Sequence, residues 1–223
     1  MSIQTDFLKR TPYFSDLDPA VLDSIANFFF EKKAERGEMF LLEGETDEVL
    51  YFVVSGAVKV LKTSADGKEQ ILNIARPGDS FNDVAVFDGR PNPAAVQAMG
   101  PVVIYGIRKD NLKTIIREHP EIALNAIKVL ANRARYLLSL VEDLSFKHVI
   151  GRIAKILLNH AGDGTGTGQR LTQQDMAAMA GTVREIVGRS LKALENEGAI
   201  RLDHHRIVIT DKAMLEKIMN EPL

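Results

Sequence analysis

The longest regular pattern in this sequence belongs to a helix. After Pro120 the chain has no glycine or proline up to Phe146, and apolar residues recur there at intervals of four and three residues. This row consists of Ala123, Ile127, Leu130, Ala134, Leu137, Val141 and Leu144. Such spacing is the heptad pattern of a helix that pairs with another helix. The segment therefore predicts one helix of about 40 Å, at about 1.5 Å per residue.

Two arrangements would cover this apolar row. In a parallel homodimer the interface would consist of Ile127, Leu130, Ala134, Leu137, Val141 and Leu144. The alternative is an amphipathic helix buried within one chain. The strict 3.5-residue period favours the dimer. A second apolar row (Ile122, Ala126, Val129 and Leu138) is expected to face the rest of the same chain.

The residues before this helix indicate a β-rich unit. Glycines recur every 11 residues, at Gly56, Gly67, Gly78, Gly89 and Gly100. Short runs of β-branched and aromatic residues lie between them. Short strands with turn signals at this spacing are typical of an all-β sandwich, roll or barrel. A short helix over residues 18–30 is expected to precede this unit.

A helix-turn-helix pattern follows the long helix. Thr172-x-x-Asp175 and Thr182-x-x-Glu185 have the spacing of capping boxes, and Ala180-Gly181 forms a tight turn between the two helices. Further elements are a glycine-rich loop at 162–168, strands at Ile200–Leu202 and Arg206–Ile209, and His204-His205 in the turn between those strands. The strand pair predicts the wing of a winged variant.

The second of these helices has two faces. Val183, Val187, Leu191 and Leu194 form its expected buried stripe, and Arg184, Glu185, Gly188, Arg189 and Lys192 form an exposed face. A glycine within a helix costs about 1 kcal/mol relative to alanine. Close approach of another molecule to the Gly188 backbone would compensate for that cost. Arginine forks match guanine in the major groove, and a carboxylate accepts from cytosine.

Composition excludes several classes of protein. The 223 residues contain no cysteine, which rules out disulfides, thiolate nucleophiles and cysteine-ligated iron–sulfur clusters. No apolar run is long enough to span a membrane and no secretory signal is visible, so we expect a cytoplasmic protein. No phosphate loop, metal-ligand spacing or Ser/His/Asp array is present, so an enzyme is not expected.

Several segments together resemble the Crp–Fnr family of bacterial transcription regulators. Residues 182–195 are similar to its recognition helix, 171–177 to the helix before it, and Gly151-Arg152-Ile153-Ala154 to its hinge-proximal segment. Residues 44–56 and 77–81 are similar to its cyclic-nucleotide-binding β-roll. The resemblance covers nearly the whole chain in the order of the family. A cyclic-nucleotide module that controls an enzyme or channel is the rival, and it would lack the winged helix-turn-helix.

The resemblance implies an α+β fold with three parts. These are a double-stranded β-helix (jelly-roll) sensor domain at 1–117, a dimerisation helix at 118–146 and a winged helix-turn-helix DNA-binding domain at 147–223. It also implies a homodimer that binds a small-molecule effector and double-stranded DNA and that recruits or blocks RNA polymerase.

The resemblance also suggests a DNA sequence. The set Arg184, Glu185 and Arg189 is of the cAMP-receptor type, which reads palindromes with TGTGA-like half-sites. The expected DNA-binding residues are Arg184, Glu185, Gly188, Arg189, Lys192, Thr172, Thr182 and Arg206, with Lys192 and Arg206 on phosphates.

The expected effector pocket departs from the family. It lies between the β-roll and the long helix and consists of Asn82, Asp83, Pro93, Ala94, Arg133, Leu137 and Leu138. In the cAMP receptor, Gly-Glu, Arg-Ser and Thr-Ser hold the nucleotide, whereas this chain has Asn82-Asp83, Pro93-Ala94 and Leu137-Leu138 in those places. An anion buried without a cationic partner is costly. We therefore expect an effector other than cAMP, and an Asp83–Arg133 salt bridge that persists without a nucleotide.

Other readings of the effector stay open. A cAMP-responsive regulator of the cAMP-receptor type is the alternative function. Haem, a nitrogen-oxide signal or another small molecule would suit the more apolar pocket walls, although no histidine stands out as a haem ligand. The cofactor is thus left unknown at this point.

Overall fold

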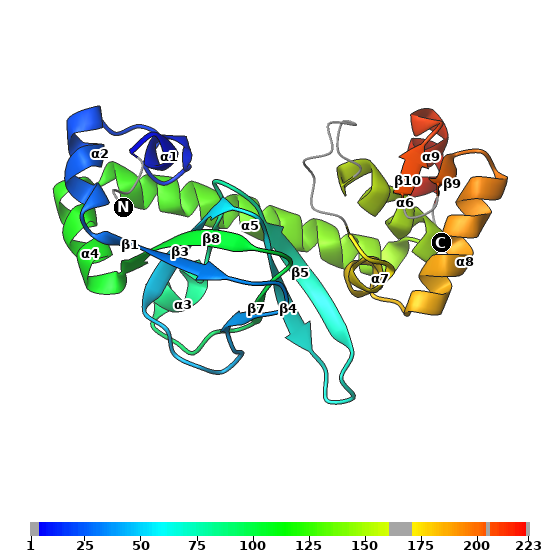
Figure 1. Cartoon of the computed structure of the whole chain (residues 1–223), viewed down its shortest axis with the longest axis horizontal. Coiled ribbons are helices and arrows are strands. Elements are labelled where there is room, and N and C mark those ends of the chain that lie inside the picture. The colour runs from blue at the N-terminus through cyan, green and yellow to red at the C-terminus, as the bar shows by residue number, and fades with distance from the viewer. Residues whose placement is uncertain (1–4, 161–170, 204–205, 222–223) are drawn as a thin grey trace. The chain divides into compact units, whose positions relative to one another are not determined.

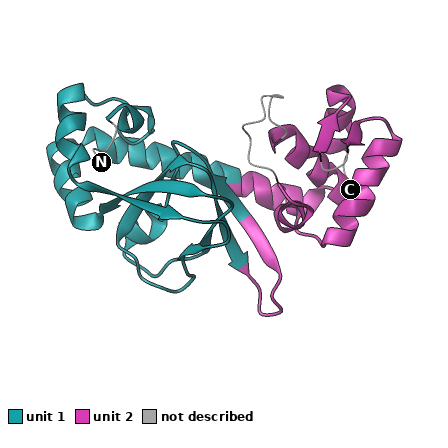
Figure 2. Ribbon diagram, in the orientation of Figure 1, with its two compact units in different colours: residues 1–62, 72–136 teal, residues 63–71, 137–223 magenta. Residues whose placement is uncertain are grey.

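The computed structural model describes residues 5–160, 171–203 and 206–221. It divides into two compact units, one of residues 1–62 and 72–136 and one of residues 63–71 and 137–223 (Figure 2). The predicted glycine-rich loop at 162–168 and His204-His205 lie outside the described residues.

The first unit is built around two four-stranded sheets, apart from the hairpin at residues 63–71, which is grouped with the second unit (Figure 1 and Figure 2). The strands are β1 (Phe29–Ala34), β2 (Met39–Leu41), β3 (Val49–Ser55), β4 (Val58–Thr63), β5 (Glu69–Ala75), β6 (Ser80–Phe81), β7 (Ala95–Ala98) and β8 (Val102–Arg108). Their order is β1-β8-β3-β6 in one sheet and β2-β7-β4-β5 in the other. Neighbouring strands pair in antiparallel fashion, as Tyr51 opposite Gly106 illustrates. The predicted β-roll of an α+β fold is confirmed.

The evenly spaced glycines belong to turns of this β-roll. Gly56 follows β3 with φ of 79°, and a Cβ atom there would lie 2.4 Å from the carbonyl oxygen of Pro101. Only glycine fits such a site, because both the backbone angle and the space exclude a side chain. Gly67, Gly78 and Gly89 also have positive φ.

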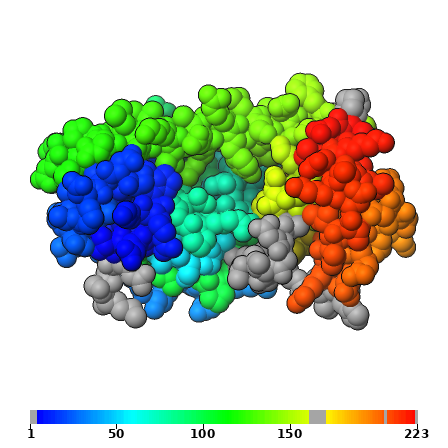
Figure 3. Space-filling view, turned by 90° about the horizontal axis from the view of Figure 1, so that it is seen from above, coloured from blue at the N-terminus to red at the C-terminus, as the bar shows by residue number. Residues whose placement is uncertain are grey.

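Among the described residues, the helices that begin in the first unit are α1 (Thr5–Arg10), α2 (Pro19–Ala26), α3 (Asp83–Asp88), α4 (Lys109–Glu118) and α5 (Glu121–Phe146). Phe7, Leu8, Ile115 and Ile122 belong to one buried cluster that joins the N-terminal helices to α4 and α5. Figure 3 shows the N-terminal segment in blue beside the green start of the long helix. The helix predicted over 18–30 ends earlier, at Ala26, because the aromatic residues from Phe29 onward join a sheet.

Helix α5 has the predicted length and two distinct rows. Ile122 and Ala126 are buried, and Val129 packs against the same cluster, as predicted for the inner row. Leu138 does not join that row, because its side chain is 70% exposed in the single chain. At about 3.6 residues per turn, Leu138 lies on nearly the opposite face of α5 from Ile122.

The second unit contains the helix-turn-helix and the strand pair. Its elements are α6 (Val149–His160), α7 (Gln173–Ala180), α8 (Arg184–Asn196), β9 (Ile200–Asp203), β10 (Arg206–Ile209) and α9 (Lys212–Met219). The strands pair in antiparallel register, with Arg206 opposite Asp203. The winged helix-turn-helix is therefore confirmed, and α9 is an additional helix that the sequence pattern had not indicated.

Candidate DNA interface and effector site

The turn between α7 and α8 is fixed by its cap residues. Thr172 forms the predicted capping box, since its Oγ1 accepts from the Asp175 backbone N–H at 3.0 Å and the Asp175 carboxylate accepts from the Thr172 N–H at 3.0 Å. Gly181 ends α7 with φ of 63°, where a Cβ atom would lie 2.7 Å from Cδ2 of Leu144. The positive φ favours glycine at this turn.

The second predicted capping box is absent. Helix α8 begins at Arg184, its N-cap is Val183, and no side chain caps it. Val183 was expected in the buried stripe, but it is 50% exposed because it lies outside the helix in extended backbone. Thr182 lies in the turn, where its N–H donates to the Ala177 carbonyl oxygen.

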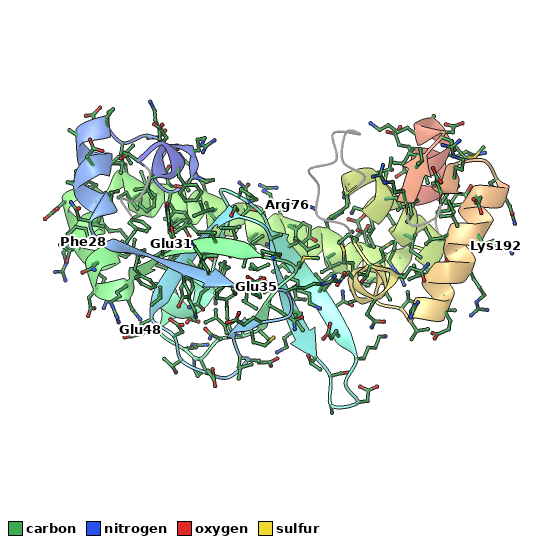
Figure 4. All side chains as sticks on the ribbon, in the orientation of Figure 1. Phe28, Glu31, Glu35, Glu48, Arg76 and Lys192 are labelled. Atoms are coloured by element: carbon green, nitrogen blue, oxygen red, sulfur yellow. The ribbon has the colours of Figure 1, made fainter. Side chains whose placement is uncertain are left out.

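Helix α8 otherwise has the predicted faces. Val187, Leu191 and Leu194 are buried, whereas Arg184, Glu185, Arg189 and Lys192 are exposed. Figure 4 shows Lys192 projecting from the outer side of α8. Within the described part of the chain, none of these four exposed side chains forms an ion pair or a side-chain hydrogen bond.

Gly188 lies between the exposed arginines. An added Cβ atom there would meet no other atom within 4 Å, so packing within the chain does not require glycine. The open backbone and the unpaired charges together form a surface of about two helical turns that an outside molecule can reach. Arg206 on β10 is exposed as well.

A buried carboxylate, Asp143, joins α5 to α6 within the second unit. Its Oδ1 lies 2.9 Å from Nζ of Lys147, and its Oδ2 pairs with Nζ of Lys155. Lys155 also donates to Oγ of Ser139 at 3.0 Å. The paired ammonium groups compensate for the burial of this charge.

Arg152 connects the same joint to α7. Its Nε donates to the carbonyl oxygen of Ala180 at 2.8 Å, and its Nη1 donates to that of Lys147 at 2.6 Å. These acceptors lie at or just beyond helix ends, where carbonyl groups lack partners within the helix. Burial lowers the pKa of Arg152, and the Asp143 carboxylate opposes this shift.

In the first unit a fully buried carboxylate, Asp83, stands at the start of α3. Nη1 of Arg133 donates to its Oδ1 at 2.5 Å, which confirms the predicted salt bridge. Its Oδ2 accepts from the hydroxyl groups of Tyr13 at 2.8 Å and Ser80 at 2.6 Å. Arg133 further donates from Nη2 to the carbonyl oxygen of Ser80 at 2.9 Å. The carboxylate is therefore bound entirely by groups of the same unit.

Tyr13 lies between α1 and α2 and shares this network. Burial, together with the Asp83 carboxylate, raises the pKa of Tyr13 far above its ordinary value. The phenol therefore stays protonated and remains a donor. Sequence patterns gave no indication of Tyr13 or Ser80, because both reach Asp83 through tertiary packing.

The other predicted pocket residues differ in their exposure and in their hydrogen-bond partners. The side-chain nitrogen of Asn82 donates to the carbonyl oxygens of Asp47 at 3.0 Å and Val49 at 2.9 Å. Ala94 is buried and Pro93 is exposed. Leu137 and Leu138 belong to the second unit and are both exposed.

Two searches were restricted to the residues that the structure describes. No group of three or more His, Cys, Asp or Glu side chains there could hold a metal ion. In the same residues, every helix is too short or too polar to cross a membrane.

Comparison with known families and proteins agrees with this geometry. The family profile "Cyclic nucleotide-binding domain" matches residues 31–119, and "Crp-like helix-turn-helix domain" matches residues 151–218. A CRP-like cAMP-activated global transcriptional regulator from Mycobacterium tuberculosis is 31% identical over 219 residues, covering 95% of this chain and 98% of the relative. The chain belongs to the Crp–Fnr family.

Further members support this assignment. The cyclic AMP receptor protein of Thermus thermophilus is 30% identical to this Crp–Fnr protein, covering 95% of this chain and 98% of the relative. A solved CRP-family transcriptional regulator from the same organism has a TM-score of 0.73 at 26% identity, covering 85% of this chain and 97% of that one. FixK2 from Bradyrhizobium japonicum shares the fold, with a TM-score of 0.76 at 24% identity and coverage of 85% and 96%. This Crp–Fnr protein is a DNA-binding transcription regulator with a cyclic-nucleotide-binding-type domain.

Proposed function

We propose that this protein acts as a homodimer that reads a palindromic, TGTGA-like DNA site under the control of a small-molecule effector other than cAMP. The observation that carries the DNA-reading part is the exposed face of α8. Arg184, Glu185 and Arg189 have no partner within the described chain and surround the open backbone of Gly188.

Each group on this surface has a matching feature in DNA. The guanidinium forks of Arg184 and Arg189 fit O6 and N7 of guanine, and the carboxylate of Glu185 accepts from N4 of cytosine. Lys192 and Arg206, with Thr172 and Thr182, contact phosphates and fix the register of the helix. Gly188 allows the helix backbone to approach the groove closely.

The outer row of α5 supports the homodimer. Ile127 and Val141 are each 60% exposed in the single chain, and Ala134, Leu137 and Leu144 are exposed too, whereas Leu130 is partly buried. An apolar row of this length on a single chain favours a partner. Its heptad period matches a second copy of the same helix. A twofold dimer presents two α8 helices, as a palindromic site requires.

The partners that Asp83 already has within the chain support an effector other than cAMP. Arg133, Tyr13 and Ser80 already satisfy this buried carboxylate, so it has little capacity left for a sugar hydroxyl. Pro93 and Ala94 themselves carry no positive charge for a phosphate. The relatives are named for cAMP, and a cAMP-responsive regulator is therefore the competing function.

In this proposal the effector acts through α5. It contacts Arg133, and its preference for one of two conformations shifts the population toward DNA binding or release. The affected step is recruitment or exclusion of RNA polymerase.

Fluorescence anisotropy with labelled DNA tests the proposal. We expect tighter binding to a TGTGA-type palindrome than to a duplex with one half-site scrambled, and sedimentation of the free protein as a dimer. Calorimetry should detect no specific cAMP binding, and cAMP should not raise DNA affinity. Micromolar cAMP binding with a gain in DNA affinity would establish the competing function instead.

A further inference from the structure

Asn92 is a buried amide without a hydrogen-bond partner. Its side chain belongs to a residue that is only 2% exposed, and neither Nδ2 nor Oδ1 has a partner among the described residues. An unsatisfied buried polar group costs about 1–3 kcal/mol, and more than about nine-tenths of such groups in folded proteins are paired. A ligand or an internal water would supply the hydrogen bonds that the described residues do not give this amide.

The backbone around Asn92 holds the amide in place. Its N–H donates to the carbonyl oxygen of Glu45 at 2.8 Å, and its carbonyl oxygen accepts from the N–H of Gly44 at 2.9 Å. Pro91 and Pro93 flank it, and each ring fixes its own φ. The main chain at Asn92 is thus fixed, and the residue is almost fully buried.

A cation beside this segment is already paired with a carboxylate. Nζ of Lys62 donates to the carbonyl oxygen of Pro93 at 3.1 Å, but it also pairs with the Glu43 carboxylate at 2.5 Å. Arg90 is exposed to solvent. A phosphate at Asn92 would also leave the amide oxygen without a donor, because a phosphate dianion only accepts.

We propose that Asn92 binds the effector through both atoms of its amide and selects an uncharged group that offers a donor and an acceptor side by side. Carboxamides, lactams and the edges of nucleobases have this pattern, and asparagine pairs with such an edge in two hydrogen bonds. The inference rests on the proposed sensor role of the first unit and names the chemical class that this unit recognises.

Ligand-detected NMR on the full chain tests this with three probes: nicotinamide as a carboxamide, uracil as a lactam, and inorganic phosphate as an anion. We expect nicotinamide or uracil to bind the unsubstituted chain and phosphate not to bind. Asn92→Leu should weaken the bound probe about tenfold or more, which corresponds to about 1.4 kcal/mol. Asn92→Asp, of the same shape, should weaken it as well because the donor is lost.

Some outcomes overturn the inference. Binding of neither amide-type probe, preference for phosphate, or equal binding to Asn92→Leu would each show that the amide does not select the ligand. In the first case an internal water satisfies it.

Asn125 is a matched control for folding. It is also an asparagine buried in the first unit, but its Nδ2 donates to the carbonyl oxygen of Tyr13 at 3.3 Å and to Asp16 at 3.2 Å. Asn125→Leu should lower the melting temperature, whereas Asn92→Leu should leave it unchanged or raise it. An equal loss in both variants would mean that the Asn92 amide is a structural group, and would overturn the inference.

DNA binding separates this inference from the proposed function. Asn92→Leu without any probe should bind the palindrome as the unsubstituted chain does. If the unsubstituted chain fails to prefer the palindrome, the proposed function fails. If it binds DNA normally but the probes bind the unsubstituted chain and Asn92→Leu equally, only the inference fails.

Discussion

The charged groups around Asp83 in the first unit and those on α8 in the second unit are in opposite situations. Asp83 is fully buried and bound by Arg133, Tyr13 and Ser80. Arg184 and Arg189 are exposed, and no described residue pairs with them. The first group stabilises the fold of its own unit, whereas the second is available for a partner. The same distinction applies to apolar groups, since the inner row of α5 is buried and its outer row is not.

Breaking the outer row of α5 should have the largest effect. Val141→Glu would bury an unpaired charge once in each chain of the proposed dimer, which costs several kcal/mol. Sedimentation should show monomers, and binding to the palindrome should fail because two linked α8 helices are needed. Asn132→Glu, exposed on the same helix but outside the heptad row, should remain dimeric. A dimeric Val141→Glu protein would place the interface elsewhere.

Asp83→Ala should cause the largest loss of stability within one unit. Removal of the carboxylate leaves Arg133 without its counter-charge, and breaking a buried pair in this way costs about 3–5 kcal/mol. Denaturant unfolding measures the change. Glu118→Ala is the control, because Glu118 is exposed and has no partner in the described chain, so its loss should cost little. Equal stability of the two variants would contradict a stabilising role for Asp83.

On α8, Arg184→Ala and Arg189→Ala should change sequence preference without affecting the fold. Each should remove discrimination at one G·C pair and cost about 1–3 kcal/mol of specific binding. Competition binding with single-base variants of the palindrome measures this. Lys217→Ala on α9 serves as the exposed cationic control. Full retention of base preference in both arginine variants would assign the readout to other residues.

Tyr13→Phe removes one hydrogen bond from the network around Asp83 and should cost less stability than Asp83→Ala. Loss of one hydrogen bond to Asp83 should cost about 1 kcal/mol near neutral pH. Because folding raises the pKa of Tyr13, the unfolded chain loses this proton first, and the tyrosine lowers stability as pH rises above about 10. The stability difference between the two proteins should therefore shrink in alkaline solution. A constant difference in pH-dependent unfolding would mean that the phenol is not held protonated.

The smallest effect is expected at Lys192 and Arg206, the proposed phosphate contacts. Lys192→Ala or Arg206→Ala should weaken binding to all DNA sequences alike and reduce the slope of log K against log salt by about one unit. Salt titrations on specific and scrambled duplexes measure the slope. A loss confined to the palindrome would indicate a base contact instead.

The carboxylate of Asp143 resembles that of Asp83, because it is buried and paired within its own unit, although it lies in the second unit. Lys147 and Lys155 pair with its carboxylate, and Arg152 links the same region to the end of α7. Within the second unit, the packing of α6 and α7 against the last turns of α5 therefore depends on ion pairs and hydrogen bonds as well as on apolar contacts.

Local patterns in the sequence determined much of this protein. The heptad row of α5, the capping box at Thr172, the glycine turn at Gly181 and the exposed face of α8 were all predicted, because each depends on residues within a few helical turns of one another. Local rules were less reliable at boundaries, where Thr182 has the spacing of a cap but Val183 occupies the N-cap position.

Only the tertiary structure decided which polar side chains have partners within the chain and which do not. Tyr13 lies 70 residues before Asp83 and Arg133 lies 50 residues after it, yet both contact the same carboxylate. Asn92 and Asn125 are the same residue type, and the fold gives partners to the amide of one and withholds them from the other. The physical reason is that burial removes water, so a polar side chain depends on whichever groups distant segments bring to it.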